Sequence, residues 1–261
     1  MNPPTIRFDD GAAYERLMGR WSLLVAEPFL DWIAVPAGSR WLDVGCGNGA
    51  FTECLFQRCA PASVQAFDPS PAQLAYARQR LPADAPVQWL EAGAQHLPVP
   101  DAAADAAVMA LVLFFVPEPA EGVAEMVRAV RPGGCVAAYH WDMPGGGFPL
   151  AVIAEELKGF GRRATPPPQA DVSTLEASEA LWRGAGLRDV STRPFTVQRT
   201  FANFAEYWDS AGGSNTIRST LAEFDAEQVA TLRERVRVRL GGGDGPLTLS
   251  ARANAVRGTR P

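Results

Sequence analysis

The sequence of 261 residues lacks the marks of several classes of protein. Its four cysteines form no CxxC pair and its two histidines stand at no ligand spacing, which argues against a disulfide framework or a metal site. The longest apolar run, residues 106–116, falls far short of the ~20 residues that a membrane-spanning helix needs. The acidic N-terminus lacks the apolar core of a signal peptide. We therefore expect no metal, no membrane span and a cytoplasmic location.

Basic residues are not gathered into a cluster, and the net charge is −5. A nucleic-acid-binding surface is therefore not expected. The content of hydrophobic residues, 47%, suits one large globular domain over residues 1–261.

Strand and helix patterns alternate through the first half of the chain. Apolar residues at helical spacing predict one or two N-terminal helices within 12–33, interrupted near Pro28. Helices are predicted at 48–59, 71–81 and 118–130, and strands at 40–45, 63–68, 87–92, 105–115 and 135–141. This alternation is typical of a parallel sheet with helices on both faces and a ligand site at the carboxyl ends of its strands.

The second half is less regular. A helix at 149–160, a helix opened by a Ser173–Glu176 capping box and a strand at 187–200 are predicted, and strict alternation over 247–256 indicates an antiparallel or edge strand. A helical insertion, residues 201–245, separates these two strands. The predicted fold is α/β and Rossmann-like: a seven-stranded, mostly parallel sheet with one antiparallel strand, helices on both faces, N-terminal helices and an insertion before the last strand.

The stretch WLDVGCGNGAFTE, residues 41–53, contains the main functional signal. Glycines at alternate positions allow a tight turn and close approach of a ligand, and the following helix offers free N–H groups to an anionic group. Asp68 ends the next strand, where a carboxylate can accept both hydroxyls of a ribose. Asp43, just before the turn, would repel a dinucleotide phosphate and attract an ammonium group. The spacing GxGxG also differs from the GxGxxG of nicotinamide enzymes, so S-adenosylmethionine is the favoured cofactor.

Four segments, LDVGCGNG, FDPSPAQLAYAR, LPVPDAAADAAV and EMVRAVRPGG, resemble those of class I S-adenosylmethionine-dependent methyltransferases. The resemblance is to the small-molecule type related to the ubiquinone/menaquinone C-methyltransferases. YERLMGRWS, AAYHWD and SARANAVRG extend it over nearly the whole chain. It divides the single domain into an N-terminal helical cover (1–35), a cofactor-binding core (36–142), the rest of the sheet (143–200 and 246–261) and a helical lid (201–245).

The resemblance and the charge argument together imply a set of cofactor-binding residues. They are Asp43, Gly45, Cys46, Gly47, Gly49, Asp68, Pro69, Ser70, Gly93, Ala94, Gln95, Leu111 and Tyr14. Gly93 departs from the family pattern, because an aspartate that meets the adenine usually stands there. Recognition of adenine could pass to the Ala94 N–H, to Gln95 or to His96.

Transfer of a methyl group from a sulfonium is an in-line displacement, and proximity, alignment and exclusion of water can drive it. A general base is needed only if the acceptor must lose a proton early. His140, Asp142 and Tyr14 are the candidates. An apolar pocket could be walled by Phe114, Phe115, Trp141, Phe148, Phe204, Tyr207 and Trp208.

Methylation of a small, partly apolar acceptor is the leading hypothesis. A non-catalytic cofactor-binding protein, a nicotinamide-dependent oxidoreductase and a protein or nucleic-acid methyltransferase are the alternatives. The acidic charge argues against the last of these. The sequence leaves the acceptor atom and a homodimer open.

Overall fold

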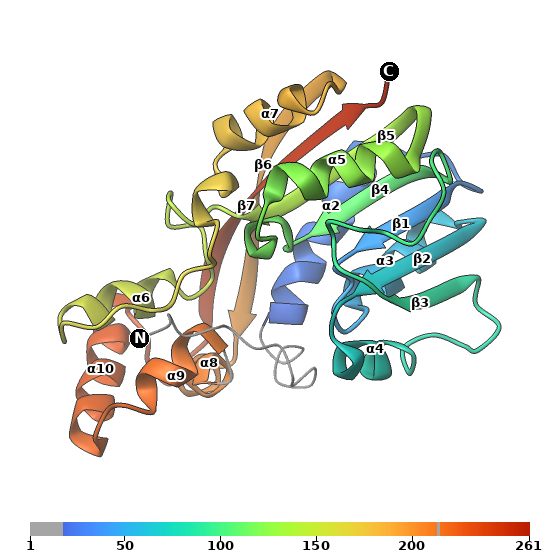
Figure 1. Cartoon of the computed structure of the whole chain (residues 1–261). Coiled ribbons are helices and arrows are strands. Elements are labelled where there is room, and N and C mark those ends of the chain that lie inside the picture. The colour runs from blue at the N-terminus through green and yellow to red at the C-terminus, as the bar shows by residue number, and fades with distance from the viewer. Residues whose placement is uncertain (1–17, 213–214) are drawn as a thin grey trace.

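A computed structural model of the chain describes residues 18–212 and 215–261 (Figure 1). Tyr14, a predicted site residue, lies outside the described residues. In the first half the elements are α2 (Arg20–Ile33), β1 (Arg40–Val44), α3 (Ala50–Cys59), β2 (Ser63–Asp68), α4 (Pro71–Ala77), β3 (Val87–Glu91), β4 (Ala104–Ala110), the 3-10 helix η2 (Leu113–Phe115), α5 (Pro119–Ala129) and β5 (Val130–Trp141).

The second half supplies two more strands and a group of helices. Its elements are α6 (Ala151–Lys158), the 3-10 helix η3 (Ala170–Ser173), α7 (Leu175–Gly184), β6 (Arg188–Phe201), α8 (Phe204–Gly212), α9 (Asn215–Leu221), α10 (Ala226–Arg239) and β7 (Leu247–Thr259). No helix of the described residues is both long and apolar enough to cross a bilayer.

The seven strands form one sheet in the order β3-β2-β1-β4-β5-β7-β6. β7 is antiparallel to both of its neighbours, β5 and β6, and the pairs among β1 to β5 are parallel. The predicted α/β fold with one antiparallel strand is confirmed. Val44 pairs with Phe67, so the turn after β1 and Asp68 at the end of β2 lie at the same edge of the sheet.

The core has two apolar layers, one on each face of the sheet, and successive side chains of β5 point alternately into one and the other. Tyr139 packs with Trp21, Phe29 and Phe51, from α2 and α3, on one face. Ala138 packs with Val123, Met126 and Trp182, from α5 and α7, on the other. Because successive residues of a strand point to opposite faces, Tyr139 and His140 are separated by the sheet. This separation decides which polar groups of β5 can reach the site.

Some element boundaries differ from those predicted. β4 ends at Ala110 rather than at residue 115, because Leu111 has a φ of 63° and the chain turns there into η2. α2 is not interrupted, and it runs through Pro28. Because Pro28 has no N–H, the Leu24 carbonyl lacks its helical hydrogen bond. Leu24 is 39% exposed, so water can donate to this carbonyl instead.

The start of α7 also differs from the prediction. Thr174, not Ser173, is the N-cap, and its hydroxyl accepts from the Ala177 N–H. Ser173 Oγ instead accepts from the Met143 N–H and donates to the Ala170 carbonyl. The cap prediction was therefore wrong by one residue, because Ser173 has closer partners in the loop.

The helical insertion between β6 and β7 is present, as predicted. It gathers with α6 at the end of the long β6–β7 hairpin, away from β1 to β3 (Figure 1). Phe224 contacts Phe160 with ring centroids 5.2 Å apart, and Arg239 forms an ion pair with Glu156 at 2.9 Å. These contacts fix the insertion to α6.

Candidate functional site

The glycine turn after β1 combines two packing glycines with one that leaves open space. Gly45, Gly47 and Gly49 have positive φ angles of 79°, 53° and 81°. A Cβ on Gly45 would lie 2.4 Å from the Val112 side chain, and one on Gly49 would lie 2.9 Å from Trp89. A Cβ on Gly47 would meet nothing within 4 Å. The turn therefore packs closely on its inner side and exposes bare backbone at Gly47.

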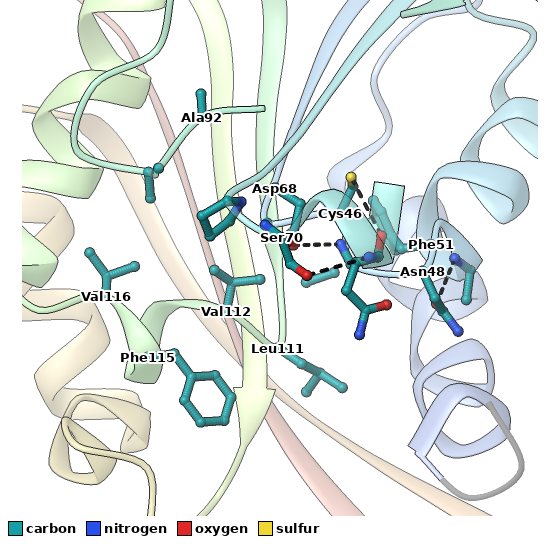
Figure 2. A pocket seen from close by; sticks show the side chains of 18 of the residues that line it. Cys46, Asn48, Phe51, Asp68, Ser70, Ala92, Leu111, Val112, Phe115 and Val116 are labelled. Carbon is teal, nitrogen blue, oxygen red and sulfur yellow. Dashed lines mark hydrogen bonds between the residues drawn. The ribbon is translucent and has the colours of Figure 1, made fainter. Parts of the chain in front are cut away.

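Asp68 lies beside this turn and is fixed by backbone groups. Its Oδ2 accepts the Gly47 N–H and its Oδ1 accepts the Ser70 N–H, both at 2.9 Å (Figure 2). Burial raises the pKa of Asp68, and these two N–H groups act in the opposite direction. The carboxylate is thus held in one orientation before any ligand binds.

Asp43 lies within the structure behind the turn, with no exposed surface. Its Oδ2 accepts the hydroxyl of Thr52 at 2.5 Å. Among the described residues Oδ1 has no hydrogen-bond partner. Burial is the main cause that raises the pKa of Asp43 to about 7, and the hydrogen bond from Thr52 lowers it. A cation or an ordered water near Oδ1 would stabilise the ionised form.

A cavity of about 590 Å³ opens above the glycine turn, at the carboxyl ends of the strands. Its lining is Ser22, Gly45, Cys46, Gly47, Asn48, Ala50, Phe51, Asp68, Pro69, Ser70, Gln73, Ala92, Gly93, Ala94, Gln95, Ala110, Leu111, Val112, Phe115, Val116 and Pro117. Figure 2 shows Asp68, Ser70, Cys46 and Asn48 on one side of it and Leu111, Val112, Phe115 and Val116 on the other. The first side therefore carries polar groups with Phe51 beside them, and the second side is apolar.

Most of the predicted cofactor residues line this cavity. Those that do are Gly45, Cys46, Gly47, Asp68, Pro69, Ser70, Gly93, Ala94, Gln95 and Leu111. Asp43 and Gly49 do not, since both lie behind the turn that they help to shape. His96 is also absent from the lining.

His140 does not lie at the cavity, contrary to the expected position of a general base. It is fully buried on the α7 face of the sheet, where its Nε2 lies 2.8 Å from Ser178 Oγ and its ring contacts Phe114. Burial lowers the pKa of His140 to about 4, although nearby Asp142 opposes this shift. The imidazole is therefore neutral near pH 7, and its Nε2 faces Ser178 of α7 rather than the cavity.

Asp142 also lies outside the lining of the cavity. Its Oδ1 accepts the Gly145 N–H at 2.9 Å, and its Oδ2 forms an ion pair with Arg252 of β7. A Cβ on Gly145 would overlap both side chains of this pair. Asp142 therefore holds the turn after β5 against β7.

Comparison with known proteins agrees with this geometry. Residues 42–138 match the family described as "Methyltransferase domain". The chain is 34% identical over 112 residues to a demethylmenaquinone methyltransferase of Clavibacter sepedonicus, covering 43% of this chain and 45% of that protein. It is 36% identical over 117 residues to a trans-aconitate 2-methyltransferase of Methylobacterium nodulans, covering 45% and 44%.

A solved structure extends the likeness beyond this region. Phosphoethanolamine N-methyltransferase 2 of Haemonchus contortus, in complex with S-adenosylmethionine, has a TM-score of 0.61 and 18% identity, covering 98% of this chain and 57% of that one. At this identity the likeness concerns the fold. Residues 42–138 of the chain therefore form a class I S-adenosylmethionine-dependent methyltransferase domain. The matched region spans less than half the length of the two curated relatives.

The methyltransferase domain was recognisable from its sequence motifs, and that prediction is confirmed. Its residues also fit S-adenosylmethionine, the predicted cofactor. Bare backbone at Gly47 and the fixed Asp68 carboxylate suit an adenosyl group, and the unpartnered Oδ1 of Asp43 suits an ammonium group nearby. In the described residues, no cluster of three or more His, Cys, Asp or Glu could hold a metal.

Other wall residues of the methyltransferase cavity were missed by sequence reasoning. Of the seven aromatic residues predicted to wall an apolar pocket, Phe115 lines the cavity, but Phe114, Trp141, Phe204 and Tyr207 are buried in the core. Phe148 and Trp208 pack against that core. No sequence motif marks Ser22 or Val112 as a site residue. The N-terminal helix α2 brings Ser22 to the cavity, and the turn after β4 brings Val112 there. A φ of 63° at Leu111, which is costly for a residue with a side chain, produces that turn.

Proposed function

We propose that this protein transfers a methyl group from S-adenosylmethionine to a small, partly apolar acceptor by in-line displacement. The observation that carries the proposal is the Asp68 carboxylate, oriented by the Gly47 N–H at the floor of the cavity. It is supported by the match of residues 42–138 to the methyltransferase domain. The curated relatives act on demethylmenaquinone and on trans-aconitate by name, so small acceptors are already represented among similar proteins.

Different residues of the cavity would bind different parts of the cofactor. Asp68 would accept the ribose hydroxyls with the lone pairs that Gly47 and Ser70 leave available. Gly47 would admit the methionine part, and the negative charge of Asp43, buried behind the turn, would attract its ammonium group without direct contact. Gly93, Ala94 and Gln95 would flank the adenine.

When bound, S-adenosylmethionine supplies an activated methyl group on a sulfonium. The chain then has to align the acceptor with that methyl and to exclude water. Leu111, Val112 and Phe115 are apolar wall residues that suit both tasks. We propose no base role for His140 or Asp142, because each already has structural partners away from the cavity. Tyr14 stays a candidate base or cofactor contact.

Three further predictions belong to this proposal. We also propose that the whole protein is located in the cytoplasm and forms a homodimer. The insertion 201–245 would act as a lid only through movement, because its described residues do not line the cavity.

Calorimetry tests the cofactor assignment. S-adenosylhomocysteine should bind with a stoichiometry of about one. NAD should not bind, since the GxGxG spacing differs from that of nicotinamide enzymes and Asp43 would repel a dinucleotide phosphate. Binding of NAD with no binding of S-adenosylhomocysteine would contradict the proposal. Labelled S-adenosylmethionine, incubated with fractions of a metabolite extract, then identifies the acceptor. Cofactor binding without any transfer would favour the non-catalytic alternative.

A further inference from the structure

Tyr139 of β5 contacts three separate parts of the cavity wall, although it is fully buried itself. Its hydroxyl lies 3.0 Å from Ser22 Oγ and donates to the Ser22 carbonyl at 3.3 Å. Its ring centroid lies 6.0 Å from that of Phe51, and its carbonyl accepts the Leu111 N–H at 2.8 Å. Ser22, Phe51 and Leu111 all line the cavity. One residue thus fixes wall positions on α2, on α3 and after β4.

The Ser22 hydroxyl can serve a ligand in two ways. When Tyr139 donates its proton to the Ser22 carbonyl, the Ser22 hydroxyl can donate to Tyr139 Oη, and its two lone pairs can accept from a ligand. When Tyr139 donates to Ser22 Oγ, the proton of Ser22 is released for a ligand. A hydroxyl on the ligand, which is both donor and acceptor, complements either arrangement.

The apolar wall of the cavity indicates the chemical character of the remainder of the ligand. Leu111, Val112, Phe115, Val116 and Pro117 provide apolar surface in the cavity. Figure 2 shows the first four of them. Burying a polar group against such a wall is costly unless it finds a hydrogen-bond partner. An apolar body with one hydroxyl near Ser22 satisfies both conditions.

We propose that Ser22 contacts the methyl acceptor and that Tyr139 is a positioning residue which orients the Ser22 hydroxyl. The acceptor is then an aromatic or other apolar molecule that carries a hydroxyl group. This inference rests on the proposed function, because it concerns the acceptor side of the same cavity.

The test uses 2-naphthol and naphthalene as probes for the full chain saturated with S-adenosylhomocysteine. Their affinities are measured for wild type, Ser22→Ala, Tyr139→Phe and Ser250→Ala. The last variant removes a hydroxyl from the exposed face of β7 and serves as the control. Loss of one neutral hydrogen bond should lower the ratio of naphthol to naphthalene affinity about two- to tenfold in Ser22→Ala. Tyr139→Phe should lower the ratio less, and Ser250→Ala should leave it unchanged.

A purely structural role would change both probes together and would leave their ratio constant, which would overturn the role of Ser22. A ratio unaffected by Tyr139→Phe alone would overturn the positioning role. Failure of both probes to bind the wild-type complex would overturn the acceptor class. Failure of S-adenosylhomocysteine itself to bind is a different result, and it would remove the proposed function together with this inference.

Discussion

Two polar regions stand at the carboxyl ends of parallel strands on opposite sides of β4, and they differ in what they face. After β1 and β2, Gly47 and Asp68 line the cavity, and backbone N–H groups hold the Asp68 carboxylate. At the end of β5, His140 and Asp142 are more deeply buried, and their partners are Ser178 and Arg252. Position at a strand end is therefore not sufficient for a role at the site.

The difference follows from the pleat of β5 and from the closing strand. His140 points to the face that α7 covers, while Tyr139 points to the α2 face, next to the cavity. β7 pairs with β5 and supplies Arg252, which neutralises Asp142. Perturbed titratable groups near a cavity are candidates for catalysis, yet burial against a helix perturbs them equally well. The two regions should therefore respond differently to substitution.

The largest expected effect is on cofactor binding in Asp68→Ala. This change removes a carboxylate that would form two charge-assisted hydrogen bonds, worth about 3–6 kcal/mol together. The dissociation constant of S-adenosylhomocysteine, measured by calorimetry, should rise at least about a hundredfold. Asp84→Ala, which changes an exposed loop carboxylate, is the matched control. A change of less than tenfold in a folded Asp68→Ala protein would mean that the two regions do not differ as proposed.

Within the cavity region, substitutions of Gly49 and Gly47 should differ in their cost to stability. Gly49→Ala places a Cβ 2.9 Å from Trp89 at a φ of 81°, so we expect a loss of about 2–4 kcal/mol in the free energy of unfolding. Gly47→Ala meets no neighbour and should cost only about 1 kcal/mol, for the left-handed backbone alone. Chemical denaturation of both variants measures the difference. Equal losses would show that packing does not explain the pattern of glycines.

The same comparison explains what could be read from the sequence. The glycine turn and Asp68 were found because local spacing encodes a turn, a helix start and a strand end. The strand containing His140 was also found, but its orientation depends on which helix covers each face, and no local pattern records that. Leu111 shows the same limit, since its φ of 63° ends β4 inside an apolar run that reads as continuous strand. Ser22 reaches the cavity only through tertiary packing on Tyr139.

In the region around α7, protonation of His140 should make the free energy of unfolding depend on pH. Its pKa is lowered to about 4 in the folded chain, against 6.5 for an unperturbed histidine. Between these values the unfolded chain binds more protons, so stability falls as pH decreases from about 6.5 toward 4. By pH 5 this loss amounts to about 2 kcal/mol. The change in the free energy of unfolding from pH 7 to pH 5 is measured by denaturation, and in His140→Gln it should be more favourable than in wild type by about 2 kcal/mol.

Asp43 has the opposite sign and must be separated from that measurement. Its pKa is raised from 3.8 to about 7, so the folded chain binds more protons and stability falls as pH rises through that interval. Saturation with S-adenosylhomocysteine, whose ammonium group would favour ionised Asp43, should reduce this second dependence without altering the first. If the change in stability from pH 7 to pH 5 is the same in His140→Gln as in wild type, His140 does not contribute to the pH dependence.

The smallest effect is expected in Thr174→Ala, which removes the N-cap of α7. The Ala177 N–H then loses the Thr174 hydroxyl at 3.1 Å, and such a loss typically costs about 1 kcal/mol. The free energy of unfolding should fall by this amount, while the affinity for S-adenosylhomocysteine stays at the wild-type value. Thr196→Ala on the exposed face of β6 provides the matched control for removal of a threonine hydroxyl and methyl. Because α7 also holds Ser178 against His140, a weakened affinity in Thr174→Ala would mean that the α7 region and the cavity are energetically coupled after all.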